Sequence, residues 1–214
     1  MTGHPQYRQA TVADLEGIGE VFVAAFPDSV SHYVRRPLSP RVMADGFGIC
    51  LDAEPEAFFV ATMDDNVAGY IFAPAHPPRV FSTAIRRGHL ARMIWRWIRG
   101  EYGVGIRPAL LTAGNLVHTW RGTTGSDLHS DAQIFSVAVH PDFHGQGIGT
   151  NLTRLGLDYL ESSGAKRVRL EVRPDNSPAI HIYEKLGFHT KGHTRDTQGT
   201  WLIMLKDMHQ EDGK

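Results

Sequence analysis

The sequence predicts a mixed α/β (α+β) fold built as a single domain. Segments with strand-like alternation and segments with helical periodicity follow one another along the chain. In the C-terminal half, a β-branched run, a glycine-rich turn and an amphipathic helix come in direct succession. The chain has 214 residues, of which 42% are hydrophobic and 21% charged, and this composition excludes disorder or a coiled coil as the main architecture. We therefore expect one domain over residues 1–214.

The first part of the chain predicts a strand followed by two helices. A short extended piece is expected at Tyr7–Gln9. After it, Thr11 can cap a helix whose apolar residues recur at helical spacing up to Pro27. A second helix is expected over Pro40–Leu51.

A β-hairpin is expected next. Two apolar runs, Ala57–Thr62 and Val67–Ala73, are separated by the turn-forming residues Asp64, Asp65 and Asn66. The chain therefore opens in the order β-α-α-β-β.

The composition changes between about Ala75 and Leu128. This segment contains eight arginines, no lysine and only two acidic residues, Glu101 and Asp127, so its local charge is near +6. We expect an insertion here (about 75–128), built around a basic amphipathic helix over Thr83–Gly100. Three interpretations stay open. The helix can be a solvated lid on the sheet, a recognition element for an anionic acceptor, or, with least support, a docking element for an anionic membrane surface. The three basic residues expected to share one face of the helix are Arg92, Arg96 and Arg99.

The strongest periodic signals come last. A β-branched strand over Ile134–Val139 stops at a turn, and a helix follows from Ile148 to Gly164. Another strand is expected at Arg167–Val172. Ser177 can cap a helix that ends at Gly187. A final strand pair, Phe188–Lys191 and Thr200–Leu205, surrounds a turn at Gln198 and Gly199.

The turn between the first of these strands and its helix is the main functional signal. Three alternating glycines let backbone N–H groups point inward and continue into a helix N-terminus, which favours a bound anion such as phosphate. The spacing fits neither the dinucleotide fingerprint nor the nucleotide triphosphate loop, and an ordinary glycine-rich turn is the alternative. The turn consists of His144, Gly145, Gln146, Gly147, Ile148, Gly149 and Thr150.

Taken together, four motifs resemble the GNAT superfamily of acyl-coenzyme A-dependent N-acetyltransferases. They are Val137-Ala138-Val139-His140-Pro141, His144-Gly145-Gln146-Gly147-Ile148-Gly149, Asn176-Ser177-Pro178-Ala179 and Tyr183-Glu184-Lys185-Leu186-Gly187-Phe188. The resemblance covers Ala132–Leu205 closely and the β-α-α-β-β opening loosely. It implies a mixed, mostly antiparallel central sheet with two splayed parallel strands, flanked by helices on both faces.

The resemblance also implies how acetyl-coenzyme A binds. Main-chain N–H groups from His144 to Thr150 would hold its pyrophosphate, although the family usually has Arg or Gln where His144 stands. Val137 and Val139 would pair with the pantetheine arm as with a neighbouring strand. Asn176 would lie near the same arm, or would serve only its own turn.

For catalysis, the resemblance assigns the backbone N–H of Val137 to the oxyanion and the phenol of Tyr183 to the departing thiolate. A half-buried structural tyrosine is the alternative for Tyr183. The general base is open, because Gln133 stands where several family members carry a glutamate. Asp131, acting through water, ranks first among the candidates, and a site without a base that accepts a neutral amine is also open. The other candidates are His129, His140 and His181.

The sequence therefore predicts an N-acetyltransferase that moves the acetyl group of acetyl-coenzyme A to a primary amine of a small molecule, which can be anionic, such as an amino sugar. Acetylation of a protein N-terminus or lysine is an alternative, as is a non-catalytic acyl-coenzyme A sensor. The net charge of −1 gives no sign of a nucleic-acid partner, and a homodimer is open. We expect no metal despite twelve histidines, a buried rather than nucleophilic Cys50, and a cytoplasmic location.

Overall fold

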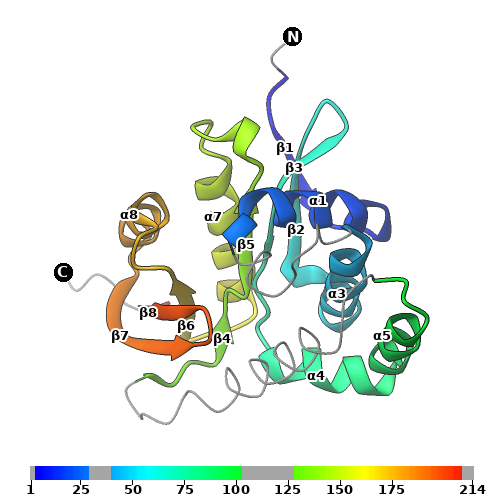
Figure 1. Ribbon diagram of the computed structural model, residues 1–214. Coiled ribbons are helices and arrows are strands. Elements are labelled where there is room, and N and C mark those ends of the chain that lie inside the picture. The colour runs from blue at the N-terminus through cyan, green and yellow to red at the C-terminus, as the bar shows by residue number, and fades with distance from the viewer. Residues whose placement is uncertain (1–2, 29–39, 103–127, 209–214) are drawn as a thin grey trace, which may run out of the picture.

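The computed structural model describes residues 3–28, 40–102 and 128–208, and it contains two four-stranded sheets with helices around them (Figure 1). The sheets have the orders β1-β2-β3-β5 and β4-β6-β8-β7. The predicted α+β class is confirmed. Among the described residues, no helix is long and apolar enough to cross a membrane.

The first sheet is antiparallel throughout. It consists of β1 (Gln6–Gln9), β2 (Phe58–Met63), β3 (Asn66–Phe72) and β5 (Ser136–Val139). The hairpin between β2 and β3 is confirmed, and its two turn residues have positive φ angles of 47° and 64°, as a tight hairpin turn requires.

The second sheet is mixed. The strands β4 (Ala132–Gln133) and β6 (Arg167–Val172) pair in parallel, whereas β8 (Gly199–Asp207) pairs antiparallel with both β6 and β7 (His189–Asp196). The two terminal strands are therefore longer than the sequence predicts.

One stretch of chain belongs to both sheets. The predicted strand over Ile134–Val139 is broken, because β4 ends before Ile134 and β5 begins after Phe135. Ile134 N–H donates to Arg169 O at 2.9 Å in the second sheet, and Phe135 N–H donates to Phe72 O at 2.9 Å in the first. From this point β5 and β6 have different partners, and we call the divergence of the two strands the fork.

Two helices cover one face of the first sheet. A short 3-10 turn (Val12–Asp14) leads into α1 (Leu15–Ala25), and α3 (Pro40–Ala53) packs beside it. Thr11 and Asp14 form a capping box, and the Asp14 carboxylate also accepts hydrogen bonds from Arg8 Nη1 and Nη2, each at 2.7 Å. The second helix predicted over Pro40–Leu51 is confirmed as α3, which ends two residues later, at Ala53.

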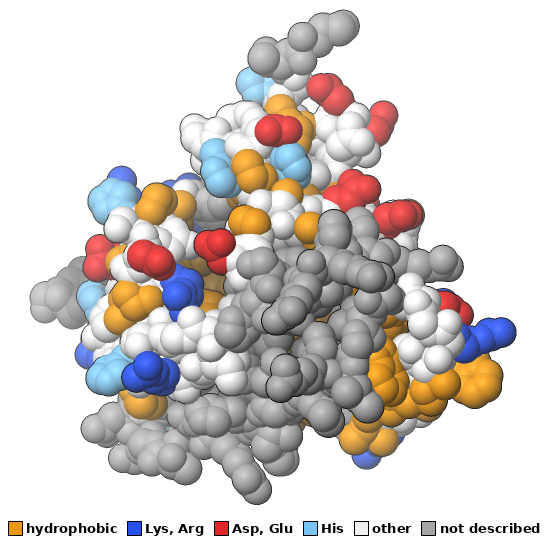
Figure 2. Space-filling model, in the orientation of Figure 1, with side chains coloured by type: hydrophobic (Ala, Val, Ile, Leu, Met, Phe, Trp, Pro, Cys, Tyr) orange, Lys and Arg blue, Asp and Glu red, His pale blue; other side chains and the backbone are white. Residues whose placement is uncertain are grey.

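The arginine-rich segment forms two helices within its described part, so the single predicted helix over Thr83–Gly100 is wrong. α4 (Pro77–Arg86) and α5 (His89–Ile98) are separated by Gly88, whose φ of 71° is left-handed and interrupts the helical path. Both helices contact α3. Hydrophobic side chains gather on the surface over α5, at the lower right of Figure 2.

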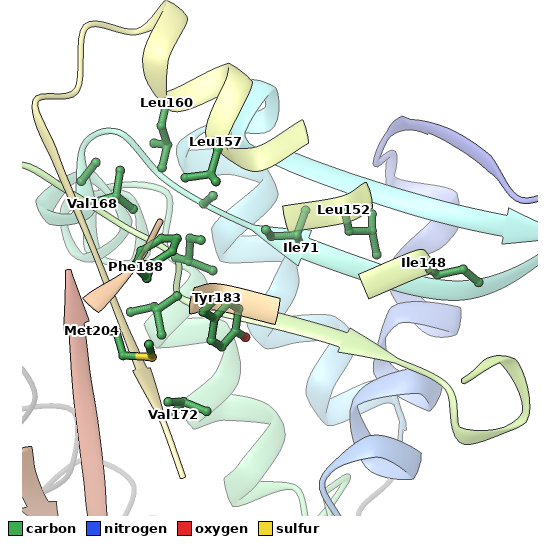
Figure 3. Packing of buried hydrophobic residues seen from close by; sticks show 14 of the residues in the cluster. Ile71, Ile148, Leu152, Leu157, Leu160, Val168, Val172, Tyr183, Phe188 and Met204 are labelled. Carbon is green, nitrogen blue, oxygen red and sulfur yellow. The ribbon is translucent and has the colours of Figure 1, made fainter. Parts of the chain in front are cut away.

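The opposite face of the first sheet is covered by α7 (Ile148–Ser162), which contacts β2, β3 and β5. The other helix, α8 (Ser177–Lys185), lies beside the second sheet (Figure 1). Side chains from α7, the two sheets and α8 form one buried cluster, which Figure 3 shows from close by. The cap of α8 is Asn176 rather than the predicted Ser177, because Asn176 Oδ1 accepts the Ala179 N–H at 3.2 Å.

Candidate active site

The fork leaves one edge of β5 without a partner strand among the described residues. His140 N–H donates to Ala68 O at 2.8 Å, which fixes the side on which this strand bonds β3. Because bonded and non-bonded pairs alternate in an antiparallel ladder, the main-chain N–H and C=O groups of Val137 and Val139 lie on the other edge. By the family resemblance, this is the edge that would pair with pantetheine.

The glycine-rich turn lies at the open end of this edge. After a 3-10 turn (Pro141–Phe143), Gly145 and Gly147 adopt left-handed φ angles of 78° and 74°, and a Cβ at either position would meet only open space. The first helical bond of α7 runs from Asn151 N–H to Gly147 O, so the preceding N–H groups have no partner within the helix. An exposed turn that leads into a helix start, with N–H groups that have no partner within the helix, suits an anion.

His144 contacts the strand rather than the open loop. Its Nε2 atom lies 3.0 Å from Val139 O, and the imidazole therefore donates to the last carbonyl on the free edge of β5. This bond fixes the start of the glycine turn relative to the strand. It also occupies one of the carbonyls that, by the family resemblance, would pair with pantetheine.

Tyr183 comes from α8 and is only 8% exposed. Its ring packs at 6.0 Å from that of Phe188 within the buried cluster that Val137 also contacts. Burial raises the pKa of the Tyr183 phenol to about 12, and no described residue forms a hydrogen bond with its hydroxyl. In Figure 3 the hydroxyl points away from the cluster.

Asn176 is exposed and caps α8 through its Oδ1 atom. The local turn role that the sequence left open therefore exists. Its Nδ2 amide makes no hydrogen bond with the described residues, so the capping role leaves this donor available.

Residues 17–188 match the model of the acetyltransferase (GNAT) family. The chain belongs to the GNAT family. Members of this family use acetyl-coenzyme A, and the splayed strands of the predicted fold class are present here as the fork.

Individual relatives resemble parts of the chain. A mycothiol acetyltransferase of Actinosynnema mirum is 46% identical over 59 residues, which are 28% of this chain and 20% of that enzyme. The ribosomal protein bS18-alanine N-acetyltransferase of Escherichia coli is 44% identical over 59 residues, 28% of this chain and 40% of that enzyme. The chain thus spans less than half the length of these relatives.

Solved structures resemble the whole fold. The protein SsHAT superposes with a TM-score of 0.66 at 20% identity and covers 97% of this chain and all of its own. A putative acetyltransferase of Salmonella typhimurium, solved with acetyl-coenzyme A, has a TM-score of 0.58 at 15% identity and covers 99% of this chain and 98% of its own. At these identities the likeness concerns the GNAT fold alone.

The structure places Asp131 at the closed end of the fork, far along the strand from Val137. Its two carboxylate oxygens accept the N–H groups of Lys166 and Arg167, each at 2.8 Å. Partial burial raises the pKa of Asp131, but these backbone hydrogen bonds outweigh it and leave the pKa lowered. A carboxylate held in this way joins β4 to β6 and is poorly suited to accept a proton.

The three histidine candidates do not gather at the fork. His140 Nδ1 accepts the Asp142 N–H at 3.3 Å and caps the 3-10 turn, while His129 and His181 are exposed.

Burial raises the pKa of the Cys50 thiol to about 12, so this residue is a poor nucleophile. In the described ranges, no three His, Cys, Asp or Glu side chains are grouped as metal ligands.

Sequence reasoning missed one ionic pair at the fork. Arg169 is paired in register with Gln133, and its Nη2 atom donates to Glu171 Oε1 at 2.5 Å. Arg169 is only 2% exposed, yet its Nε and Nη1 atoms have no hydrogen-bond partner among the residues that the structure describes. The alternation of charged and apolar residues over Arg167–Val172 was the available signal, because it places Arg169 and Glu171 on one face of the strand.

Proposed function

We propose that this protein is an N-acetyltransferase that transfers the acetyl group of acetyl-coenzyme A to a primary amine of a small molecule by direct attack in a ternary complex. The observation that carries the proposal is the fork: a strand edge that has no partner strand among the described residues and that ends at a glycine turn and a helix N-terminus. Few other ligands combine an amide-bearing arm with a pyrophosphate.

The residues present fit acetyl-coenzyme A. The space around Gly145 and Gly147 and the free N–H groups before Asn151 suit the pyrophosphate. The residues that would hold it are His144, Gly145, Gln146, Gly147, Ile148, Gly149 and Thr150. The edge of Val137 and Val139 suits the pantetheine amides, and Asn176 Nδ2, at the start of α8, is a further donor for this arm. The thioester that acetyl-coenzyme A supplies would then lie inside the fork.

Two groups of the chain serve the chemistry. The N–H of Val137 is held rigidly by the pairing of β5 with β3, so it can donate to the carbonyl oxygen as negative charge develops. The Tyr183 hydroxyl, with a pKa near 12, stays protonated at neutral pH and can donate its proton to the departing thiolate. Because Asp131 is committed to backbone amides, we propose that the acceptor amine enters neutral or loses its proton to water.

The buried ionic pair supports an anionic group on the acceptor. Val168, Leu170 and Val172 belong to the cluster on the α7 and α8 side, so Arg169 and Glu171 lie on the opposite face of β6. That face also carries Gln133, the register partner of Arg169, at the base of the fork. Buried guanidinium donors without partners are costly, and a carboxylate or phosphate on the acceptor would satisfy them.

A thiol-release assay over a panel of neutral and anionic amines tests the proposal, with heat of binding of acetyl-coenzyme A measured in parallel. We expect saturable binding of acetyl-coenzyme A and turnover with at least one amine. Binding without turnover on any amine would favour a non-catalytic acyl-coenzyme A sensor, and the absence of binding would exclude both functions.

Acetylation of a protein N-terminus is the second candidate. The observation in its favour is the 44% identity over 59 residues to the ribosomal protein bS18-alanine N-acetyltransferase. Adding short peptides with free N-terminal amines to the same panel separates the two candidates, because a peptide enzyme would turn over peptides and not free amino sugars.

A further inference from the structure

Helix α5 contacts the protein through its charged side. Arg96 Nη1 lies 2.6 Å from Asp45 Oδ1, and His89 Nε2 lies 2.8 Å from Asp52 Oδ2. Tyr102, just after the helix, donates its hydroxyl to Asp45 at 2.7 Å. Both aspartates belong to α3, so ionic contacts tie α5 to its neighbour.

The other side of the same helix is apolar and faces solvent. Leu90, Ile94 and Ile98 recur every four residues and are 50%, 48% and 63% exposed, and Trp95 beside them is 59% exposed. We call these four residues the α5 apolar face. Figure 2 shows this surface as a group of hydrophobic side chains over α5, with basic side chains at its border.

This orientation is the reverse of what a helix of a globular protein adopts. Amphipathic helices normally turn their apolar stripe to the core and their charges to water. A contiguous exposed group of large apolar side chains on one helix marks a surface that contacts another apolar phase. The ionic contacts to α3 hold the helix with this surface outward.

Arginines surround the apolar face. On the helical wheel Arg92 and Arg99 lie next to Trp95, and the Arg99 guanidinium is 5.7 Å from the centroid of the Trp95 ring. Arg79 and Arg86 of α4 are also exposed. Among the described residues, Arg79, Arg86 and Arg92 form no ion pair, so their charges are available to a partner.

We propose that the α5 apolar face docks this protein on the surface of a membrane that contains anionic lipids. The apolar side chains and Trp95 would enter the boundary between headgroups and acyl chains, and the arginines would contact the lipid phosphates. The charge of the border selects this occupant. A second copy docked face to face would bring like charges together, whereas an anionic headgroup layer is complementary to them.

Vesicle flotation tests the proposal with the full chain. The vesicles contain either phosphatidylcholine alone or equal amounts of phosphatidylcholine and phosphatidylglycerol. We expect the wild-type protein to float with the mixed vesicles, and binding to weaken as salt is raised. The double variant Ile94→Asp/Ile98→Asp should lower the partition ratio by about tenfold or more, because it places charge in the buried part of the contact.

The matched control for the apolar part is Val12→Asp, since Val12 is 74% exposed and lies outside α5. It should bind vesicles as the wild type does. For the charged part, Arg86→Gln/Arg92→Gln should weaken binding to mixed vesicles, while Arg154→Gln, an exposed arginine of α7, should not.

Four outcomes would overturn the proposal. The first is no binding of the wild type to mixed vesicles, and the second is equal binding of the wild type and the aspartate double variant. The third is a wild-type dimer in light scattering that the double variant converts to a monomer, which would assign the face to a second copy. The fourth is a melting temperature that falls in the double variant but not in Val12→Asp, which would mean that the chain itself covers the face.

Discussion

Tyr183 combines a buried ring with a hydroxyl that makes no hydrogen bond to the described residues. If it protonates the thiolate, Tyr183→Phe should lower kcat by about a hundredfold while the affinity for acetyl-coenzyme A is unchanged. Stability should hardly change, because no hydrogen bond of the hydroxyl is lost. Steady-state kinetics, calorimetry and a thermal melt measure the three quantities, and an unchanged kcat would leave Tyr183 as a packing residue.

The raised pKa of Tyr183 predicts a pH profile. With a pKa of about 12, the phenol stays protonated up to about pH 10 or beyond. Between pH 7 and pH 10, ionisation of this phenol should therefore not lower the wild-type kcat. The kcat profile of Tyr183→Phe should have the same shape in this range. A basic limb in that range that disappears in Tyr183→Phe would show that the phenol titrates lower and so has a polar partner.

Asp131 provides a test of the general base. Asp131→Asn should leave kcat within about threefold at pH 7, because the wild-type carboxylate is held by the amides of Lys166 and Arg167. Its pKa is lower in the folded than in the unfolded chain, so its stabilising effect is present above the ordinary value of 3.8. That effect is lost as the pH falls through the folded value.

The variant should therefore be less stable than the wild type at neutral pH and should lose less stability on acidification below pH 4. Thermal melts across this range measure the difference. A large loss of kcat at unchanged stability would restore Asp131 as the base.

The unpaired donors of Arg169 lead us to predict that the acceptor carries a negative charge. Arg169→Gln should raise KM for anionic amines by about tenfold or more and leave KM for neutral amines unchanged. Because removing one member of a buried pair destabilises the fold, Arg169→Gln/Glu171→Gln is the matched variant that removes both charges. Equal effects on neutral and anionic amines would show that Arg169 is structural.

At the scale of single elements, α7 allows a controlled test of the glycine turn. Gly147 and Gly164 lie at its two ends, both with left-handed φ, of 74° and 80°, and both with open space where a Cβ would lie. Alanine at either site should cost about 1 kcal/mol of stability. Only Gly147→Ala should also weaken acetyl-coenzyme A binding, by about tenfold. If calorimetry shows an equal loss of acetyl-coenzyme A affinity in both variants, the glycine turn is not part of the binding site.

Elements whose sequence signal is local can be predicted well. The β2–β3 hairpin has apolar runs around an Asp-Asp-Asn turn, and α7 has a helical repeat bounded by glycines, so periodicity locates both. The boundary of α8 is predicted one residue late, because Asn176 and Ser177 are both good caps and sequence alone does not rank them.

Features that depend on distant contacts are not predictable in this way. The helical repeat places Arg92, Arg96 and Arg99 on one polar face, but Arg96 turns to Asp45, which is 51 residues earlier in the chain. Alternation places Arg169 and Glu171 on one face of the strand. Whether the guanidinium donors of Arg169 find partners depends on the residues that pack around them, which the local pattern does not show. The family resemblance predicts the fork, whereas its location between Ile134 and Phe135 depends on hydrogen bonds to two different sheets.

At the scale of the whole molecule, Glu54 joins three parts of the fold. This carboxylate is 3% exposed, and it accepts Ala75 N–H at 2.6 Å, His76 N–H at 3.2 Å and Tyr159 OH at 2.7 Å. It therefore connects the segment after α3 with the segment after β3 and with α7. Burial raises the pKa of Tyr159 to about 12, and its bond to Glu54 acts in the same direction, which keeps the phenol a donor.

Glu54→Ala would leave these three donors without their acceptor. We expect a loss of about 3 kcal/mol, or a melting temperature lower by roughly 10 °C. Glu56→Ala is the control, because Glu56 is an exposed neighbour on the same turn. A shift as small as that of the control would mean that water replaces the carboxylate.

The two strand edges at the fork also affect which other molecules can enter. The N–H and C=O groups of Val137, and the edge of β6 beyond Arg169, lack strand partners among the described residues. Such edges accept any extended chain that carries amides at strand spacing, as in the addition of a peptide strand to a sheet. A peptide tail in an extended conformation would therefore compete with the pantetheine arm that we propose for the same backbone groups.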